Sequence, residues 1–151
     1  VPDINAALKW YGKVFGWTVL MEPAPSVANK GYMGELAANL YGPEFKENRM
    51  AMMSKGNACN VEFFEYIEPQ SKKFMQDAKP WRPGWWHICI MDPDIEGMVK
   101  RIVDNGGKQI SKVWDTAPGS GLPFKICYTQ DPWGNYIEVS SRSAEFMMGP
   151  R

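Results

Sequence analysis

Several features are scarce in this sequence, and each scarcity excludes a class of protein. The chain of 151 residues has a single histidine and equal numbers of basic and acidic residues, 17 of each, so its formal net charge is zero. Balanced charge argues against nucleic acid or an anionic membrane as the main partner, because both are bound by basic surfaces. No apolar run approaches the ~20 residues of a membrane-spanning helix, and no signal peptide is visible.

Cysteine is scarce as well. Cys59, Cys89 and Cys127 are odd in number and unevenly spaced, and each stands in an apolar stretch. This pattern fits neither a disulfide framework nor a zinc site. It predicts reduced, inert core thiols in a cytoplasmic protein.

Tryptophan and methionine are abundant by contrast, with seven and ten residues in a chain that is 44% hydrophobic. A chain of this length can bury the core of one domain. These side chains either fill that core or line an aromatic, adaptable pocket. The cluster Trp81, Trp85 and Trp86 is expected in core and rim packing.

The chain contains an internal repeat with a shift of 91 residues. Asp3 and Asp94 each stand beside a proline and are plausible helix N-caps. Apolar residues at helical spacing follow each cap, and both patterns end at glycine. They are Ile4, Leu8, Tyr11 and Phe15 in the first copy, and Ile95, Val99 and Ile102 in the second.

Three strand-like segments follow each predicted helix. They are residues 17–21, 49–53 and 60–66 in the first copy, and 109–114, 124–129 and 135–140 in the second. The first copy also has an extra stretch, residues 30–48, predicted as a loop that could close over a ligand. We therefore expect one domain of two repeats, at about 1–68 and 85–143, with a linker at 69–84.

The second copy has one strand more, at residues 85–90, which contains His87. The mate of His87 in the first copy would lie five residues before Val1. We expect a trimmed strand there, because its loss would expose a sheet edge.

The last strand of each copy carries a carboxylate between apolar residues. Ile137-Glu138-Val139 matches Val61-Glu62-Phe63. In the second copy the strand follows an Asp-Pro-x-Gly turn signal at Asp131. A charge on a sheet face is costly unless it is solvated, paired or bound to a metal.

Strand alternation places the polar residues of these strands on shared faces. In the strand at residues 85–90, His87 is expected on the same face as Cys89 and on the opposite face from Trp86. In the last strand of the second copy Tyr136 shares a face with Glu138. In the last strand of the first copy Glu62 shares a face with Phe64 and Tyr66. The apolar faces suit packing under the helices. His87, Glu138 and Glu62 can therefore converge on the concave face, where a substrate pocket would include Phe64, Tyr66, Cys89, Tyr128 and Tyr136. Glu65 and Glu68 are expected to be solvated.

These motifs resemble the vicinal oxygen chelate superfamily of glyoxalase I, extradiol dioxygenases and bleomycin-resistance proteins. The resemblance rests on residues 2–16, on His87 with the Asp-Pro-Asp-Ile that follows it, and above all on the Asp-Pro-x-Gly-Asn-x-x-Glu ending at Glu138. It implies an α+β fold of two βαβββ units whose mixed sheet curls into a half-open barrel around a divalent metal (Zn, Ni, Co, Mn or Fe). It assigns His87, Glu138 and Glu62 as ligands, and its fourth ligand position falls before Val1.

The resemblance implies a glyoxalase-type lyase or isomerase, often dimeric, acting on a small, apolar or aromatic oxygenated substrate. Glu138 or Glu62 would be the catalytic base beside the metal. Two alternatives stay open. An extradiol-type Fe(II) dioxygenase needs a second histidine from upstream of Val1. A metal-free protein of the bleomycin-resistance type would use the aromatic residues alone.

Overall fold

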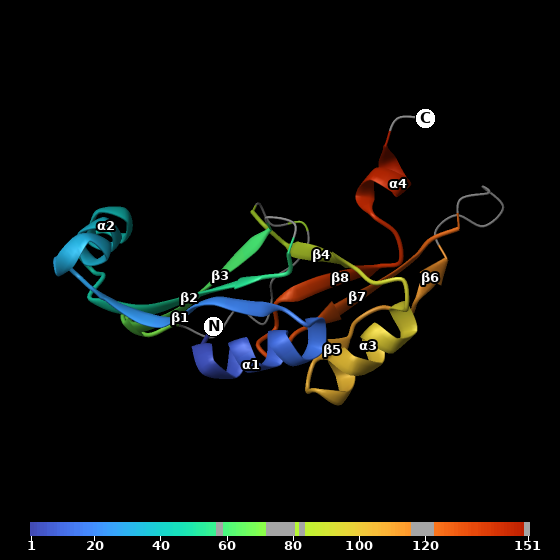
Figure 1. Ribbon diagram of the computed structural model, residues 1–151, viewed down its shortest axis with the longest axis horizontal. Helices are drawn as coiled ribbons and strands as arrows, with labels where there is room; N and C mark the ends of the chain where they lie inside the picture. Colours follow the sequence, from blue (N-terminus) through green and yellow to red (C-terminus); the bar gives the residue numbers. More distant parts are fainter. Residues whose placement is uncertain (57–58, 72–80, 82–83, 116–122, 150–151) are drawn as a thin grey trace. The chain divides into compact units, whose positions relative to one another are not determined.

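The computed structural model describes residues 1–56, 59–71, 81, 84–115 and 123–149. The chain has an α+β fold and forms two compact units, Val1–Lys73 (unit 1) and Phe74–Arg151 (unit 2), each with its own sheet (Figure 1). None of the helices in the described part of the chain is long and apolar enough to cross a membrane.

Unit 1 is an antiparallel sheet with two helices. Its strands lie in the order β1-β2-β3. Figure 1 shows α1 on one side of this sheet and α2 at its far end, on the other side. The elements are α1 (Ile4–Phe15), β1 (Thr18–Val27), α2 (Gly31–Tyr41), β2 (Glu47–Ser54) and β3 (Asn60–Glu68).

Helix α1 begins and ends where the sequence predicts. The Asp3 carboxylate accepts a hydrogen bond from the Ala6 amide at 2.9 Å, and the left-handed Gly16 (φ 70°) closes the last turn. One face of the helix is buried against the sheet, which removes apolar surface from water. Its buried residues are Ile4, Ala7, Leu8, Trp10, Tyr11 and Val14.

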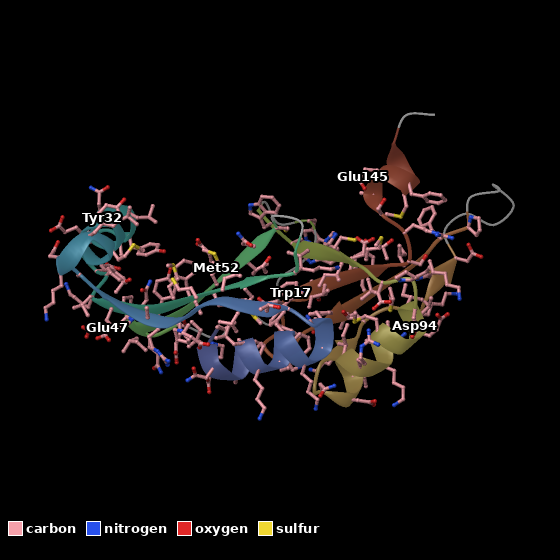
Figure 2. The ribbon with its side chains drawn as sticks, viewed as in Figure 1. Trp17, Tyr32, Glu47, Met52, Asp94 and Glu145 are labelled. Carbon is pink, nitrogen blue, oxygen red and sulfur yellow. The ribbon has the colours of Figure 1, made fainter. Side chains whose placement is uncertain are left out.

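The prediction of a loop at residues 30–48 is wrong, because α2 occupies most of it. The buried positions of α2 are the small residues Gly34 and Ala37. A Cβ at Gly34 would lie 2.0 Å from the Val27 carbonyl oxygen, so the helix approaches β1 as closely as glycine allows. Its large apolar residues face outward instead, and Tyr32 is 77% exposed (Figure 2). This inverted pattern hides the helix from a search for an apolar buried stripe.

Unit 2 is a five-stranded mixed sheet covered by α3. The strand order is β4-β8-β7-β5, with β6 also paired to β7, and β4 runs parallel to β8. The elements are β4 (His87–Met91), α3 (Ile95–Asp104), β5 (Lys108–Gln109), β6 (Trp114–Asp115), β7 (Lys125–Gln130), β8 (Tyr136–Ser140) and α4 (Ala144–Met148).

Helix α3 repeats the construction of α1. The Asp94 carboxylate accepts from the Gly97 amide at 3.0 Å, 91 residues after the Asp3 cap. Its buried face is Ile95, Met98, Val99 and Ile102. Below it lie the alternate residues of the strands: Ile90, Cys127, Thr129, Ile137 and Val139.

Unit 2 differs from the prediction in two places. The prediction of a single strand at residues 109–114 is wrong, because two short strands, β5 and β6, pair separately with β7. Helix α4 is an element that the sequence did not predict; the Ser143 hydroxyl caps it by accepting from the Phe146 amide at 3.3 Å. The linker expected at residues 69–84 lies largely outside the described residues.

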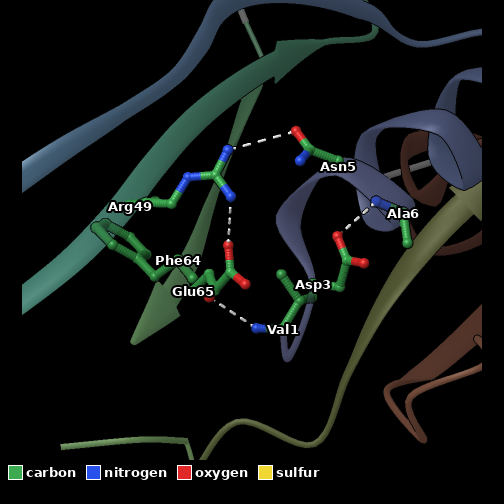
Figure 3. A network of polar contacts seen from close by, with 7 residues as sticks. All are labelled: Val1, Asp3, Asn5, Ala6, Arg49, Phe64 and Glu65. Carbon is green, nitrogen blue, oxygen red and sulfur yellow. Dashed lines mark hydrogen bonds and ion pairs between the residues drawn. The ribbon is translucent and has the colours of Figure 1, made fainter. Parts of the chain in front are cut away.

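In both units the residue two positions before the helix N-cap is bonded to the edge of the last strand. In unit 2, β4 lines the edge of β8, and the Asp92 amide then bonds the Ser140 carbonyl at 2.9 Å. In unit 1 the Val1 ammonium bonds the Phe64 carbonyl on β3 at 2.7 Å (Figure 3). Val1 is the mate of Asp92 under the shift of 91, so it binds β3 as Asp92 binds β8. The strand predicted ahead of Val1 stays a prediction.

Candidate functional site

The turn before β8 is built around the Asp131 carboxylate. Its oxygens accept from the Trp133 amide (2.9 Å), the Asn135 amide (2.8 Å) and the Asn135 side-chain amide (2.7 Å). Asp131 is 2% exposed, and Gly134 has the positive φ (95°) that the turn requires. The Asp-Pro-x-Gly-Asn sequence is therefore a structural device that starts β8 in a fixed register.

That register places three side chains in a row across the sheet. Glu138 on β8 is the neighbour of Tyr128 on β7 and of Cys89 on β4. His87, two residues before Cys89, is paired with Tyr136. The face opposite α3 thus holds these residues together, as alternation predicts.

His87 and Glu138 are in direct contact. The imidazole Nε2 lies 3.0 Å from a Glu138 carboxylate oxygen, and the two side chains are 28% and 14% exposed. Since a carboxylate can only accept, Nε2 faces Glu138 as a donor. Nδ1 is buried and has no partner among the described residues.

Tyr128 completes the surroundings of the pair. Its ring centroid lies 5.5 Å from that of His87, with the planes at 85°. Burial raises the pKa of Tyr128, and the nearby charge of Glu138 and a hydrogen bond with it raise that pKa further. The phenol is therefore held neutral, as a donor toward the carboxylate.

Trp86 is a neighbour that the sequence reasoning placed wrongly. It was expected opposite His87, but β4 begins at His87, so strand alternation does not govern Trp86. Its ring lies 5.0 Å from His87, 5.0 Å from Tyr136 and 5.4 Å from Tyr128. A strand boundary shifted by two residues was enough to hide this contact.

The other two tryptophans of the cluster are not packed as expected. Trp81 is 79% exposed and Trp85 is fully exposed. Core packing is therefore wrong for both.

Glu62, Phe64 and Tyr66 lie on the face of unit 1 opposite α1. Their β2 neighbours are Met52 and, further along, Met50 and Asn48. Figure 2 shows Met52 on this side of the sheet. Glu62 is exposed, whereas Phe64 and Tyr66 are half-buried.

Tyr66 contacts Tyr41 at the end of α2, with ring centroids 5.6 Å apart. Burial, together with hydrogen bonding to Tyr41, raises the pKa of Tyr66 to about 12. The inserted helix thus covers one end of the open face of unit 1.

Glu65 is not solvated, contrary to expectation. It lies on the α1 side of the sheet and forms an ion pair with Arg49 at 3.0 Å (Figure 3). Arg49 also reaches the Asn5 side chain on α1 at 3.5 Å. Through Arg49, Glu65 is therefore linked to α1.

The prediction of three core thiols holds for one cysteine. Cys127 is buried beneath α3, and burial raises its pKa. Cys59 and Cys89 are exposed and belong to no disulfide, so they are not core residues. Cys89 lies beside Glu138 on the neighbouring strand.

The donor types of the pair suit a first-row divalent metal, since imidazole and carboxylate are common ligands of such ions. The number of donors is incomplete, because no group of three His, Cys, Asp or Glu side chains that could hold a metal occurs among the described residues. His87 and Glu138 belong to unit 2 and Glu62 to unit 1.

Known proteins share this fold. A glyoxalase family protein from Bacillus cereus superposes with a TM-score of 0.73 at 18% identity, over 93% of this chain and 87% of that one. Glyoxalase I from Zea mays gives a TM-score of 0.60 at 19% identity, over 95% of this chain and 42% of that one. A 2-epi-5-epi-valiolone epimerase from an Actinomyces species is 22% identical over 92% of this chain and 73% of its own length.

The sequence itself matches the Glyoxalase/Bleomycin resistance protein/Dioxygenase superfamily over residues 1–139. This match runs through both units and ends just after Glu138. The chain belongs to that superfamily.

Proposed function

We propose that this protein is a metal-dependent isomerase, of the epimerase or glyoxalase type, that acts on a small oxygenated molecule. The contact between His87 and Glu138, brought together from β4 and β8, carries the proposal. The similarity to an epimerase supports an isomerase over other activities of the superfamily.

His87 and Glu138 would hold the metal from unit 2, and Glu62 is the third predicted ligand. A bound divalent ion would polarise the substrate oxygens and make a neighbouring C–H bond more acidic. Glu138 and Glu62 are the carboxylates that could remove this proton and return it.

Tyr128 would orient Glu138 in this role. Its neutral phenol donates toward the carboxylate and so holds it in one direction on the sheet face.

The decisive experiment is the metal content of the purified full-length protein, measured by elemental analysis, with titration of Zn²⁺, Ni²⁺, Co²⁺ and Mn²⁺ by calorimetry. We expect a stoichiometric metal that His87→Ala and Glu138→Gln each lose. Glu145→Gln, an exposed carboxylate on α4, is the matched control and should keep the metal. Metal retained in both site variants would refute the assignment.

A second candidate is a metal-free binding protein. The aromatic group of Trp86, Tyr128 and Tyr136 around the site favours it, as does the small number of metal donors among the described residues there. Absence of metal, with ligand binding undiminished in His87→Ala and Glu138→Gln, would establish this candidate and exclude the isomerase.

A further inference from the structure

Two adjacent residues of unit 2 each have a buried side-chain nitrogen without a hydrogen-bond partner among the described residues. The Trp86 indole Nε1 and the His87 Nδ1 are both buried, and neither forms a hydrogen bond with any described residue. Buried polar groups in native proteins are nearly always satisfied, so two neighbouring exceptions call for an explanation.

One kind of ligand group can satisfy both nitrogens. Indole Nε1–H is only a donor, whereas an imidazole nitrogen accepts or donates. A hydroxyl group can accept a hydrogen bond and donate one, so hydroxyl groups suit both nitrogens.

The surroundings of these nitrogens are rings. Trp86 is tilted by 35° to Tyr136 and by 38° to Tyr128, and stands perpendicular to His87. Such rings offer flat apolar surface, and the tyrosines add phenol groups at their tips. The Glu138 carboxylate beside them disfavours an anion.

We propose that Trp86 is a specificity residue of this site. Its indole N–H donates to an oxygen of a neutral, cyclic, hydroxylated ligand, whose ring packs against the aromatic group of Trp86, Tyr128 and Tyr136. The proposal rests on the proposed function in placing the ligand beside His87 and Glu138.

The experiment compares three variants with the unmodified protein. Trp86→Phe keeps an aromatic ring and removes the N–H, Trp86→Leu removes both, and Trp85→Phe changes the fully exposed neighbour as a control. The probes are catechol and myo-inositol, an aromatic and a saturated ring that share vicinal hydroxyls. Affinity is measured by calorimetry, and the imidazole ¹⁵N resonances of the sole histidine report whether the ligand reaches His87.

We expect at least one probe to bind the unmodified protein and to shift the Nδ1 resonance. Its affinity should fall about fivefold in Trp86→Phe, the equivalent of one neutral hydrogen bond, and further in Trp86→Leu. Trp85→Phe should leave the affinity unchanged. The probe that binds decides between an aromatic and a saturated ligand ring.

Three results would overturn the proposal. The first is that neither probe binds at millimolar concentration, and the second is that Trp86→Phe binds with the affinity of the unmodified protein. The third is that Trp86→Phe loses thermal stability but no affinity, which would indicate an enclosed water as the partner of the indole. Metal content is measured in the same samples. Ligand binding that depends on Trp86 in a metal-free protein would support this inference and refute the isomerase.

Discussion

The two units share one scaffold but carry different open faces. In each, an aspartate-capped helix covers one side of the sheet, and the last strand brings a glutamate to the other side. Glu138 meets Tyr128 and His87, whereas Glu62 is exposed beside Met52. Met52 and Tyr128 occupy equivalent positions, because each is the cross-strand neighbour of the glutamate in the last strand of its unit, and both pairs of residues are 76 positions apart. The repeat determines the position of each glutamate, and the side chains next to that glutamate determine its chemistry.

The insertion of α2 widens this difference. In unit 1 part of the open face is covered by this helix, where Tyr41 contacts Tyr66. In unit 2 the short helix α4 contacts this face at Ser140, whose hydroxyl lies 3.4 Å from the Met147 sulfur, and the aromatic residues gather around His87. Unit 2 is therefore the half in which polar chemistry is concentrated.

The largest effect is expected where the units are alike. Ile4 and Ile95 are repeat mates and both are 0% exposed. Substituting either by alanine should lower the free energy of unfolding by roughly 3–4 kcal/mol through lost burial and a cavity. Urea unfolding measures the total, and amide hydrogen exchange shows whether each change weakens mainly its own unit. A loss below about 1 kcal/mol in one mate would show that the two cores are not equivalent.

A somewhat smaller effect is expected at the turn that distinguishes unit 2. Asp131→Ala should cost roughly 2–3 kcal/mol, because it removes three hydrogen bonds to a buried carboxylate. Loss of exchange protection should concentrate in β7 and β8. The matched change in unit 1 is Ser54→Ala, where a hydroxyl accepts from the Gly56 amide in an exposed turn. If Ser54→Ala costs as much, the turns do not differ as the structure indicates.

The third prediction asks whether unit 1 contributes to the metal site. Glu62→Gln should weaken divalent metal binding about tenfold, equivalent to about 1.4 kcal/mol. Glu65→Gln is its control, because Glu65 is paired with Arg49 on the α1 side. Calorimetric titration of the two variants checks both statements. Unchanged affinity in Glu62→Gln would confine the ligands to unit 2.

The smallest effect concerns Tyr66. Its pKa is raised to about 12 in the folded chain, from 10.0. The stabilisation linked to its neutral phenol is therefore complete below pH 10 and is lost as the pH rises toward 12. The fall in the free energy of unfolding over that range should be smaller in Tyr66→Phe. Tyr32→Phe, at a 77% exposed position on α2, should keep the original slope.

The sequence predicts the elements whose signals are local. Asp3 and Asp94 predict where their helices start, and the turn signal at Asp131 predicts the start of β8, because capping and turn chemistry act within a few residues. The closeness of His87 and Glu138 follows from strand alternation once the fold is assumed.

What the sequence did not predict depends on contacts between distant residues. Helix α2 buries small residues and so lacks an apolar stripe. Trp86 packs on His87 because β4 starts two residues later than the predicted strand, which no periodicity reveals. Glu65 reads as a surface charge until Arg49 of the neighbouring strand is placed beside it.

The turn around Asp131 also bears on the order in which the site assembles. Only the five residues from Asp131 to Asn135 separate β7 from β8. Closing so short a loop costs little chain entropy, whereas His87 is 51 residues from Glu138 and must arrive from far along the chain. The hairpin that aligns Tyr128 with Glu138 can thus form first, and the imidazole then docks onto a carboxylate already oriented to receive it.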